Sequence, residues 1–272
     1  TLPLTRYTVL LDDGKTILCV YPKGHGKGGI VYKRSSDGGL TWSERLPTPE
    51  NWMSSREVPT MHRVTDAEGK KRIIMWSGLY PARLAVTEDD GATWGPLEPA
   101  GEWGGIVVMG CHFAVRGEPG HYICMFHDDG RFFTNTPNKK DPPEFILYKT
   151  LSKDGGLTWS YPTIVERSTE KHICEPGLIR SPDGKQLASG SQDKLVHVWN
   201  ASSGLLVKTF KEHTELIISV DWSPDGKTLA SGGFDNVARI WDLNGNKMSQ
   251  QLVGHTDPIE SLHWNSNGTQ LA

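Results

Sequence analysis

A 42-residue period governs the last third of this chain. Ser181-Pro-Asp-Gly-Lys185 recurs unchanged at Ser223-Pro-Asp-Gly-Lys227, and a divergent copy, Asn265-Ser-Asn-Gly-Thr269, follows after another 42 residues. Leu-Ala-Ser-Gly follows the first two copies, and Leu-Ala follows the third. Repeats of this length are typical of propellers and solenoids, in which each repeat is one supersecondary unit. The period does not extend upstream of Ser181, so the chain changes its repeat type at that point.

A different repeat occupies the first 170 residues, with the pattern Ser/Thr-x-Asp-x-Gly-x-Thr-Trp. Its three copies are residues 35–42, 87–94 and 152–159. In such a turn the aspartate accepts hydrogen bonds from backbone N–H groups, glycine supplies a positive φ, and the tryptophan buries its ring beside the turn. We therefore expect Asp37, Asp89 and Asp154 to be structural residues at hairpin tips rather than site residues.

Short apolar or alternating runs surround each of these turns and predict strands. The runs are residues 6–11, 16–21, 30–34 and 41–46, then 58–64, 72–77, 83–87 and 93–97, then 107–115, 122–127, 145–150 and 158–165. Four strands per repeat without helical periodicity predict the blades of a β-propeller. We expect an all-β fold of about six four-stranded blades, the last of them incomplete with two strands, 259–264 and 269–272. Residues 131–143 are rich in Pro, Asn and Lys and predict a surface loop.

Composition excludes several classes of function. The net charge is −3 and no Lys/Arg run occurs, which argues against nucleic acid as a partner. No apolar run approaches the ~18 residues that a membrane span needs. The four cysteines lack CxxC spacing and the histidines lack ligand spacing, so we expect buried thiols, with a disulfide left open, and neither a metal nor a cofactor. The chain begins at Thr1 without an initiator Met, so we expect a fragment and infer no compartment.

The three aspartate turns resemble the Asp boxes of sialidase-like propellers. The resemblance covers roughly residues 1–186 and implies three blades and the first strand of a fourth within residues 1–180. Members of that family release terminal sialic acid as retaining glycosidases, with a Tyr nucleophile assisted by a Glu and an Asp as acid/base. Three arginines hold the substrate carboxylate, because guanidinium groups match carboxylates in a bidentate fashion.

The resemblance transfers only part of that catalytic site to this chain. It implies that Glu175, in Cys174-Glu-Pro-Gly177, is the assisting glutamate and that Arg6 is the nearest match to the first arginine. His25 occupies the loop where the family often carries its acid/base Asp. The strand predicted at 186–191 carries no arginine, and the later blades are replaced, so we expect an incomplete catalytic set. A solvated loop carboxylate is the alternative for Glu175.

A polar cluster follows a strand that is predicted to be buried. It consists of His127, Asp128, Asp129 and Arg131, in the sequence His-Asp-Asp-Gly-Arg. Adjacent carboxylates beside His and Arg could line a substrate funnel with perturbed pKa values. The sialidase-like resemblance implies a sialoglycan or another carbohydrate as the ligand. The alternative is an Asp-Gly turn whose charges are solvated.

Residues 181–272 resemble WD-repeat propellers. Val237-Ala-Arg-Ile-Trp-Asp242 matches the strand that ends in Trp-Asp, and Gly254-His255 matches the Gly-His pair before a repeat. The resemblance implies a buried structural relay whose members hydrogen-bond one another, and a protein partner bound by the blades. The expected relay residues are His213, Ser231, Asp235 and Trp241. In the preceding repeat, His172 is one residue out of register with the period.

The two resemblances meet at Ser181–Lys185, and we expect a hybrid of two propeller families joined there into one propeller. Ser-Pro-Asp-Gly favours a β-turn, and in both families such a turn joins the first and second strands of a blade. An exchange at this turn therefore leaves the topology of the blade intact. Natural recombination, a deliberate chimera and an assembly error stay open as causes. Three hypotheses follow for function: a sialidase-type hydrolase, a glycan- or protein-binding scaffold without catalysis, or a chain without a selected function.

Overall fold

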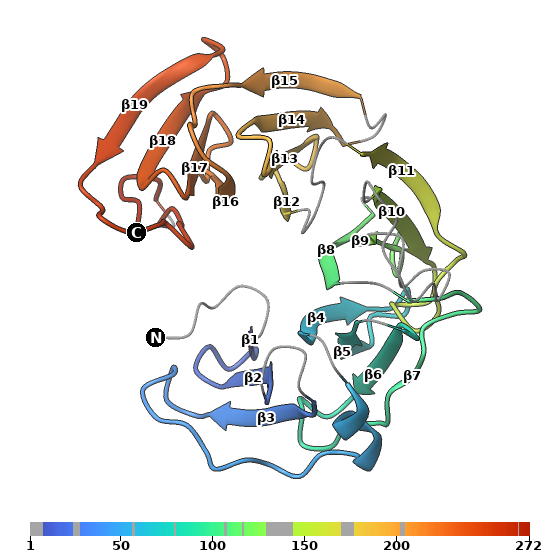
Figure 1. Ribbon diagram of the computed structural model, residues 1–272. Helices are drawn as coiled ribbons and strands as arrows, with labels where there is room; N and C mark the ends of the chain where they lie inside the picture. Colours follow the sequence, from blue (N-terminus) through green and yellow to red (C-terminus); the bar gives the residue numbers. More distant parts are fainter. Residues whose placement is uncertain are drawn as a thin grey trace. The chain divides into compact units, whose positions relative to one another are not determined.

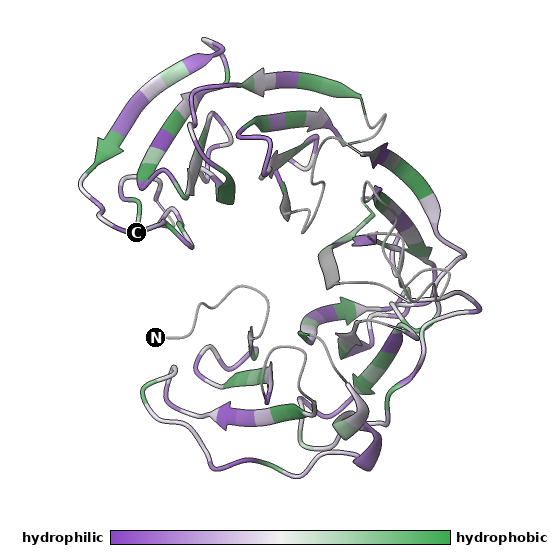
Figure 2. Ribbon diagram, in the orientation of Figure 1, coloured by the Kyte–Doolittle hydropathy of each residue, from purple (hydrophilic) through white to green (hydrophobic). Residues whose placement is uncertain are grey.

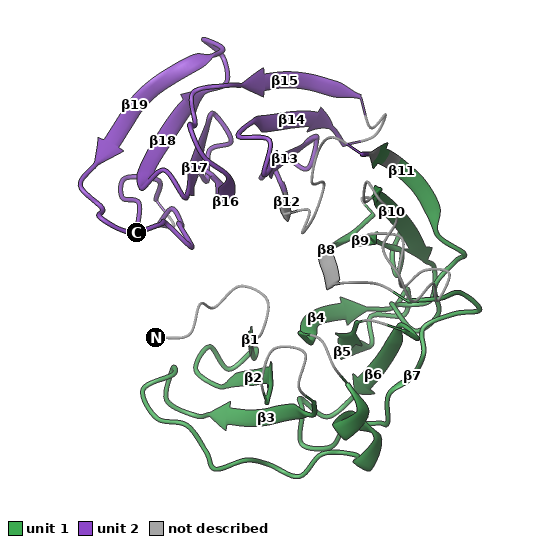
Figure 3. Ribbon diagram, viewed as in Figure 1, with its two compact units in different colours: residues 1–167 green, residues 168–272 purple. Residues whose placement is uncertain are grey.

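The computed structural model describes residues 8–23, 28–55, 58–78, 80–105, 108–115, 117–128, 144–169, 177–201, 205–265 and 267–272. Within these residues the protein is all-β, with five antiparallel sheets and a single 3-10 helix, η1 (Glu50–Ser54), that the sequence pattern did not predict (Figure 1). None of the described helices is long and apolar enough to cross a membrane. The chain forms two compact units, residues 1–167 and 168–272, which are described separately (Figure 3).

The first unit contains three sheets, each built from strands that are consecutive in the chain. The first sheet has β1 (Thr8–Leu10), β2 (Ile17–Pro22) and β3 (Ile30–Ser35). The second has β4 (Thr60–Thr65), β5 (Lys71–Ser77), β6 (Arg83–Thr87) and β7 (Glu98–Pro99). The third has β8 (Val108–Ala114), β9 (Tyr122–Asp128), β10 (Phe145–Ser152) and β11 (Thr163–Ser168).

The second unit contains two further sheets of four consecutive strands. They are β12 (Gly177–Arg180), β13 (Gln186–Gly190), β14 (Val196–Asn200) and β15 (Leu206–Phe210), then β16 (Ile217–Trp222), β17 (Thr228–Gly233), β18 (Val237–Asp242) and β19 (Lys247–Val253). Strand β12 pairs with β13 across the Ser181–Lys185 turn, with Arg180 opposite Leu187. Residues on both sides of that turn therefore share one sheet. Four-stranded antiparallel meanders of this kind are propeller blades, which confirms the predicted fold class.

The fourth strands of the first unit differ from the prediction. Residues 41–46 form no strand, β7 has only two residues, and β11 begins at Thr163 rather than at residue 158. The cause is local, because the backbone N–H groups of Thr41, Thr93 and Thr158 donate to the aspartate of their own turn. An N–H group bound to a side chain cannot also join a sheet ladder.

The two strands predicted at 259–264 and 269–272 are also wrong. The structure has a single bridge there, between Trp264 and Leu271. His263 and Ala272 also exchange two backbone hydrogen bonds, so the segment forms a short hairpin. The N–H groups of Leu262 and Trp264 point away from this hairpin and donate to Ser219 Oγ (3.1 Å) and Asp221 Oδ2 (2.9 Å) of β16. This segment is thus bound to the preceding sheet through side chains and does not build a sheet of its own.

The core lies between consecutive sheets within each unit. Hydrophobic and hydrophilic residues are interspersed along the strands (Figure 2), so the strands supply apolar side chains to the clusters between sheets of the same unit. The first and second sheets share one cluster, which includes Leu18, Tyr32 and Met75. The second and third sheets share another, which includes Trp76 and Phe126. Three of the cysteines, at positions 19, 111 and 124, are buried, and Cys174 lies outside the described residues.

Each aspartate turn is closed by its own side chains. Asp37 accepts hydrogen bonds from Thr41 N (2.9 Å) and Thr41 Oγ1 (2.6 Å), and Asp89 and Asp154 make the same two bonds with Thr93 and Thr158. The hydroxyl of Thr41, its N–H and the Ser35 hydroxyl lower the pKa of Asp37 to about 2. All three turns therefore have the same geometry, whatever sheet they follow.

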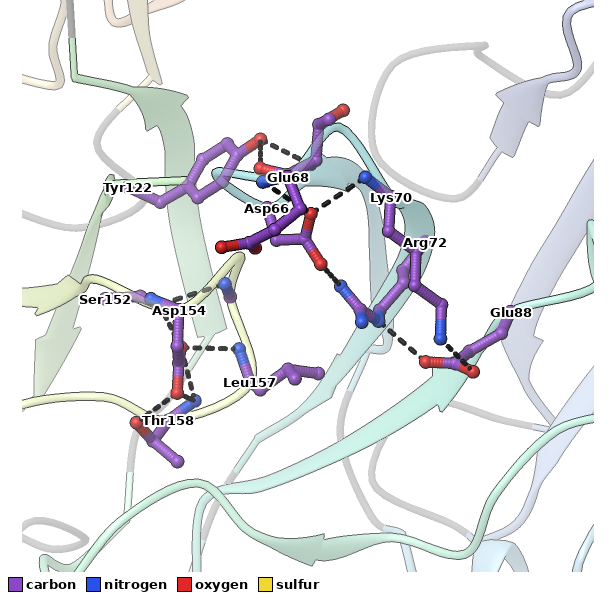
Figure 4. Close-up of polar contacts among 12 residues, drawn as sticks. Asp66, Glu68, Lys70, Arg72, Glu88, Tyr122, Ser152, Asp154, Leu157 and Thr158 are labelled. Carbon is purple, nitrogen blue, oxygen red and sulfur yellow. Dashed lines mark hydrogen bonds and ion pairs between the residues drawn. The ribbon is translucent and has the colours of Figure 1, made fainter. Parts of the chain in front are cut away.

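The third turn rests on the first hairpin of the second sheet (Figure 4). The Gly155 N–H donates to Gly120 O (2.8 Å), and a Cβ atom at Gly155 would lie 2.8 Å from the Cβ of Asp66. Asp66 is fixed by hydrogen bonds from the Lys70 N–H (2.8 Å) and from Arg72 Nη1 (2.7 Å). A turn of one blade is thus seated on a rigid hairpin of the blade before it.

Candidate functional site

A buried polar relay lies at one end of the sheet β16–β19. His213 is in the connection between β15 and β16, Asp235 is in the connection between β17 and β18, and Ser231 and Trp241 are on strands β17 and β18. Trp241 Nε1 donates to Ser231 Oγ (2.7 Å). His213 Nε2 lies 2.7 Å from the same Ser231 oxygen, and His213 Nδ1 lies 2.9 Å from Asp235 Oδ2. The four residues expected to form a relay therefore lie in one hydrogen-bonded chain.

The contacts of His213 accommodate two tautomers, which differ in the partner of Nδ1. If Nδ1 carries the proton, it donates to Asp235, while Nε2 accepts from the hydroxyl of Ser231, whose oxygen accepts from Trp241. Every polar group of the chain is then satisfied, as buried polar groups require. If Nε2 carried the proton, the Ser231 hydroxyl would have no acceptor in the relay. Nδ1 would then accept from Arg239 Nη1, which lies 2.8 Å away.

Arg239 is a fifth member that the sequence analysis missed. Its Nη1 donates to Asp235 Oδ2 (2.6 Å) and lies 2.8 Å from His213 Nδ1. The signal was present in the sequence, because Arg239 precedes Trp241 by two residues on the same strand. Residues two apart on a strand face the same side of the sheet. The side chains of Arg239 and Asp235 are 6% and 4% exposed, so this ion pair is a buried one.

The pKa values of the relay follow from its burial and contacts. Burial lowers the pKa of His213, and this effect outweighs the Asp235 carboxylate, which raises it. Burial acts on Asp235 in the opposite direction, but the N–H of Thr214 and the side chains of His213 and Arg239 hold its pKa below the ordinary value. The relay therefore contains a neutral histidine between an ionised aspartate and a serine at neutral pH.

The sheet β12–β15 carries a shorter version of the relay. Trp199 Nε1 donates to Ser189 Oγ (3.1 Å), but the loop histidine expected there, His172, lies outside the described residues. His197, 42 residues before Arg239, faces Asp193 instead, with Nε2 at 3.4 Å from Oδ2. The aspartate of this blade thus pairs with a histidine of its own sheet.

Most residues proposed for glycosidase chemistry lie outside the described part of the chain. These are Arg6, His25, Asp129, Arg131 and Glu175.

The remaining two, His127 and Asp128, end strand β9 and are 5% and 1% exposed, so the alternative of a solvated turn is wrong for them. Burial, and then the Asp128 carboxylate, raise the pKa of nearby Tyr148 to about 12. Among the described residues, no group of three or more His, Cys, Asp or Glu side chains could hold a metal ion.

The lowered pKa of His213 predicts acid sensitivity. The unfolded histidine titrates near 6.5 and the folded one below that value, so the unfolded state binds the proton first as the pH falls. The stability that His213 contributes is present above pH 6.5 and is lost as the pH drops from 6.5 towards the folded pKa. Urea unfolding at pH 8, 6.5 and 5 should show that the free energy of unfolding falls as the pH is lowered. This fall should be smaller in the His213→Gln variant. An identical pH profile in both proteins would contradict the assignment.

Comparisons with known proteins identify the second unit. The WD domain, G-beta repeat family matches residues 177–200, 204–242 and 246–272. A 43-residue segment is 42% identical to the Periodic tryptophan protein 2 homolog of Caenorhabditis elegans, a match that covers 16% of this chain and 5% of that protein. The sialidase-like resemblance of the first unit rests on its aspartate turns and their strands. The C-terminal region of the chain, by contrast, carries WD40 repeats.

Proposed function

We propose that this chain is a propeller scaffold that binds another protein at the end of the sheet β16–β19 that carries the relay. Phe234 is the observation that supports this proposal most directly. Its side chain is 49% exposed, although it directly precedes the buried Asp235. Aromatic side chains are enriched in the cores of protein interfaces. WD-type propellers commonly present such residues to protein partners.

The relay holds Phe234 in place. The Phe234 N–H donates to Leu216 O (2.9 Å), and the Thr214 N–H donates to Asp235 Oδ2 (3.2 Å). The connections that precede β16 and β18 are thereby tied together on both sides of Phe234. A side chain that is positioned before binding loses less conformational entropy on association, so more of its contact energy appears as affinity.

Substitution of Phe234 tests the proposal. Phe234→Ser should reduce partner retention at least about tenfold, the effect of removing an interface hot spot of ~1.4 kcal/mol. Leu206→Ser is the matched control, because Leu206 is 50% exposed but lies on β15 of the preceding sheet. The measurement is affinity capture with both variants and the original chain, quantified by mass spectrometry. Equal retention by all three proteins, or equal loss in both variants, would contradict the proposal.

We also propose that the chain has no complete glycosidase site, although the first unit could keep a carbohydrate ligand. The resemblance to sialidases offers Glu175 as an assisting residue, but strand β13 (Gln186–Gly190) supplies no arginine. Loss of one member of a catalytic unit typically costs orders of magnitude in rate. A fluorogenic sialoside should therefore not be hydrolysed at high protein concentration. Turnover that Glu175→Gln abolishes would overturn this part of the proposal and favour an exo-sialidase.

The hybrid origin stays a proposal of the same kind. We infer that residues 1–180 and 181–272 come from two propeller families joined at Ser181–Lys185. The pairing of β12 with β13 supports it, because a join at this turn leaves the sheet intact. The Thr228–Ser223 bonds of the second copy match the Gln186–Ser181 bonds of the first, so the turn is the same element in both repeats. Intact separate genes for the two halves in one genome would support an assembly error instead.

A further inference from the structure

Arg83 is a partly buried arginine that pairs with no acid in the described structure. It is the first residue of β6, and its Nη1 donates to Ser54 Oγ (2.7 Å). A guanidinium group has five N–H donors, and within the described residues Ser54 is the one hydrogen-bond acceptor that Arg83 finds. Its Nε is enclosed by the protein without a hydrogen-bond partner. Most of the donor capacity of Arg83 is therefore unused.

Other arginines of the same unit have carboxylate partners. Arg72 pairs with Asp66 and Glu88, each at 2.7 Å, although its side chain is only 9% exposed. Arg63, 34% exposed, pairs with Asp12 at 2.7 Å. Burial lowers the pKa of Arg83, and no neighbouring charge offsets this effect. The Arg83 guanidinium has lost part of its hydration, and hydrogen bonds within the protein replace only part of it. A negative group that bound to Arg83 would supply the missing hydrogen bonds and charge pairing.

Ser54 holds the guanidinium of Arg83 in one orientation. The Ser54 hydroxyl donates to Asn51 O (2.6 Å), so its oxygen is left to accept from Arg83. Asn51 is itself clamped, because its amide donates to Leu97 O (3.0 Å) and accepts from Leu97 N (3.0 Å). The helix η1 is thereby fixed to the segment that leads into β7. A positioned arginine of this kind binds a planar oxyanion with little further loss of entropy.

Two residues with exposed apolar side chains lie close in sequence to Ser54 and Arg83. Met53 precedes Ser54 and is 60% exposed, and Tyr80 lies on the connection into β6 and is 49% exposed. Arg, Tyr and Met are residue types that protein interfaces favour. A single guanidinium matches the one negative charge of a carboxylate, whereas a phosphate monoester carries about −1.5 to −2.

We propose that Arg83, oriented by Ser54, anchors an aspartate or glutamate side chain of a protein partner, and that Met53 and Tyr80 contact an apolar side chain beside that carboxylate. The inference rests on the proposed scaffold function and names the chemistry of its partner: an acidic residue next to an apolar one. It also places a contact surface in the first unit, outside the WD40 repeats.

The first test follows the arginine Nε–H resonances of the full chain by NMR during separate titrations with acetate, inorganic phosphate and chloride. The Arg83 resonance should move saturably with acetate, while the Arg72 resonance, already paired with two carboxylates, serves as the internal control and stays. A larger response to phosphate than to acetate would overturn the carboxylate assignment. Equal responses of both arginines, or none from Arg83, would overturn the anchor.

The second test uses blocked dipeptides and two variants of the chain. N-acetyl-Asp-Leu-amide should bind at least tenfold more tightly than N-acetyl-Asn-Leu-amide, and Arg83→Gln should abolish that preference. Arg83→Lys keeps the positive charge but lacks the planar guanidinium group, so this variant should retain only part of the preference for the Asp peptide. Urea midpoints equal to that of the original chain show that both variants are folded. No preference for the Asp peptide overturns the anchor, while the capture experiment with Phe234→Ser tests the scaffold function separately.

Discussion

The structure depends on a close approach between consecutive sheets that only glycine permits. In the first unit, a Cβ atom at Gly91 would lie 2.5 Å from both Leu18 Cδ1 and Tyr32 Oη, and one at Gly156 would lie 3.0 Å from Val64 Cγ1. The second unit meets the same constraint with the glycine of Leu-Ala-Ser-Gly, because a Cβ at Gly232 would lie 2.7 Å from Ile259 Cγ2. Two different sequence repeats thus use glycine where the next blade, or its turn, packs against the preceding sheet.

Polar side chains form hydrogen bonds between the neighbouring sheets that the glycines allow to approach closely. Tyr32 donates its hydroxyl to Gly91 O (2.7 Å), and Trp222 Nε1 donates to Ile179 O (3.3 Å), so hydrogen bonds join neighbouring sheets in both units. The relay around Asp235 has a different role, since it joins the connection that leads from β15 into β16 to the connection between β17 and β18. Buried networks of this kind rigidify a structure through their satisfied members, and in this one the Arg239 Nε is left without a hydrogen-bond partner. The rigid end of the sheet β16–β19 is the basis for placing a protein partner there.

Strands with clear alternation could be predicted from the sequence, and the bounds of β6 and β18 agree with the expected 83–87 and 237–242. The fourth strands of the first unit could not be predicted in this way. In each turn the aspartate accepts a hydrogen bond from the backbone N–H of a threonine, so that N–H cannot bond to the neighbouring strand and strand pairing begins later. Arg239 was missed for a related reason, since alternation alone places it beside Trp241 but does not show that Asp235 accepts from it. The last two predicted strands are reduced to a short hairpin, and the side-chain bonds that tie it to Ser219 and Asp221 are revealed by no local pattern.

The central claim is that turn glycines set the spacing of the blades, and two matched substitutions test it most directly. Gly91 (φ 78°) and Gly39 (φ 93°) occupy the same position in two turns and share the cost of a positive φ. A Cβ at Gly39 would meet nothing closer than Ile17 Cδ1 at 3.5 Å. Leu18 and Tyr32, the neighbours of Gly91, are 0% and 2% exposed and cannot move aside. Urea unfolding should show that Gly91→Ala lowers the free energy of unfolding by about 1–3 kcal/mol more than Gly39→Ala does. Equal losses in the two variants would contradict the account.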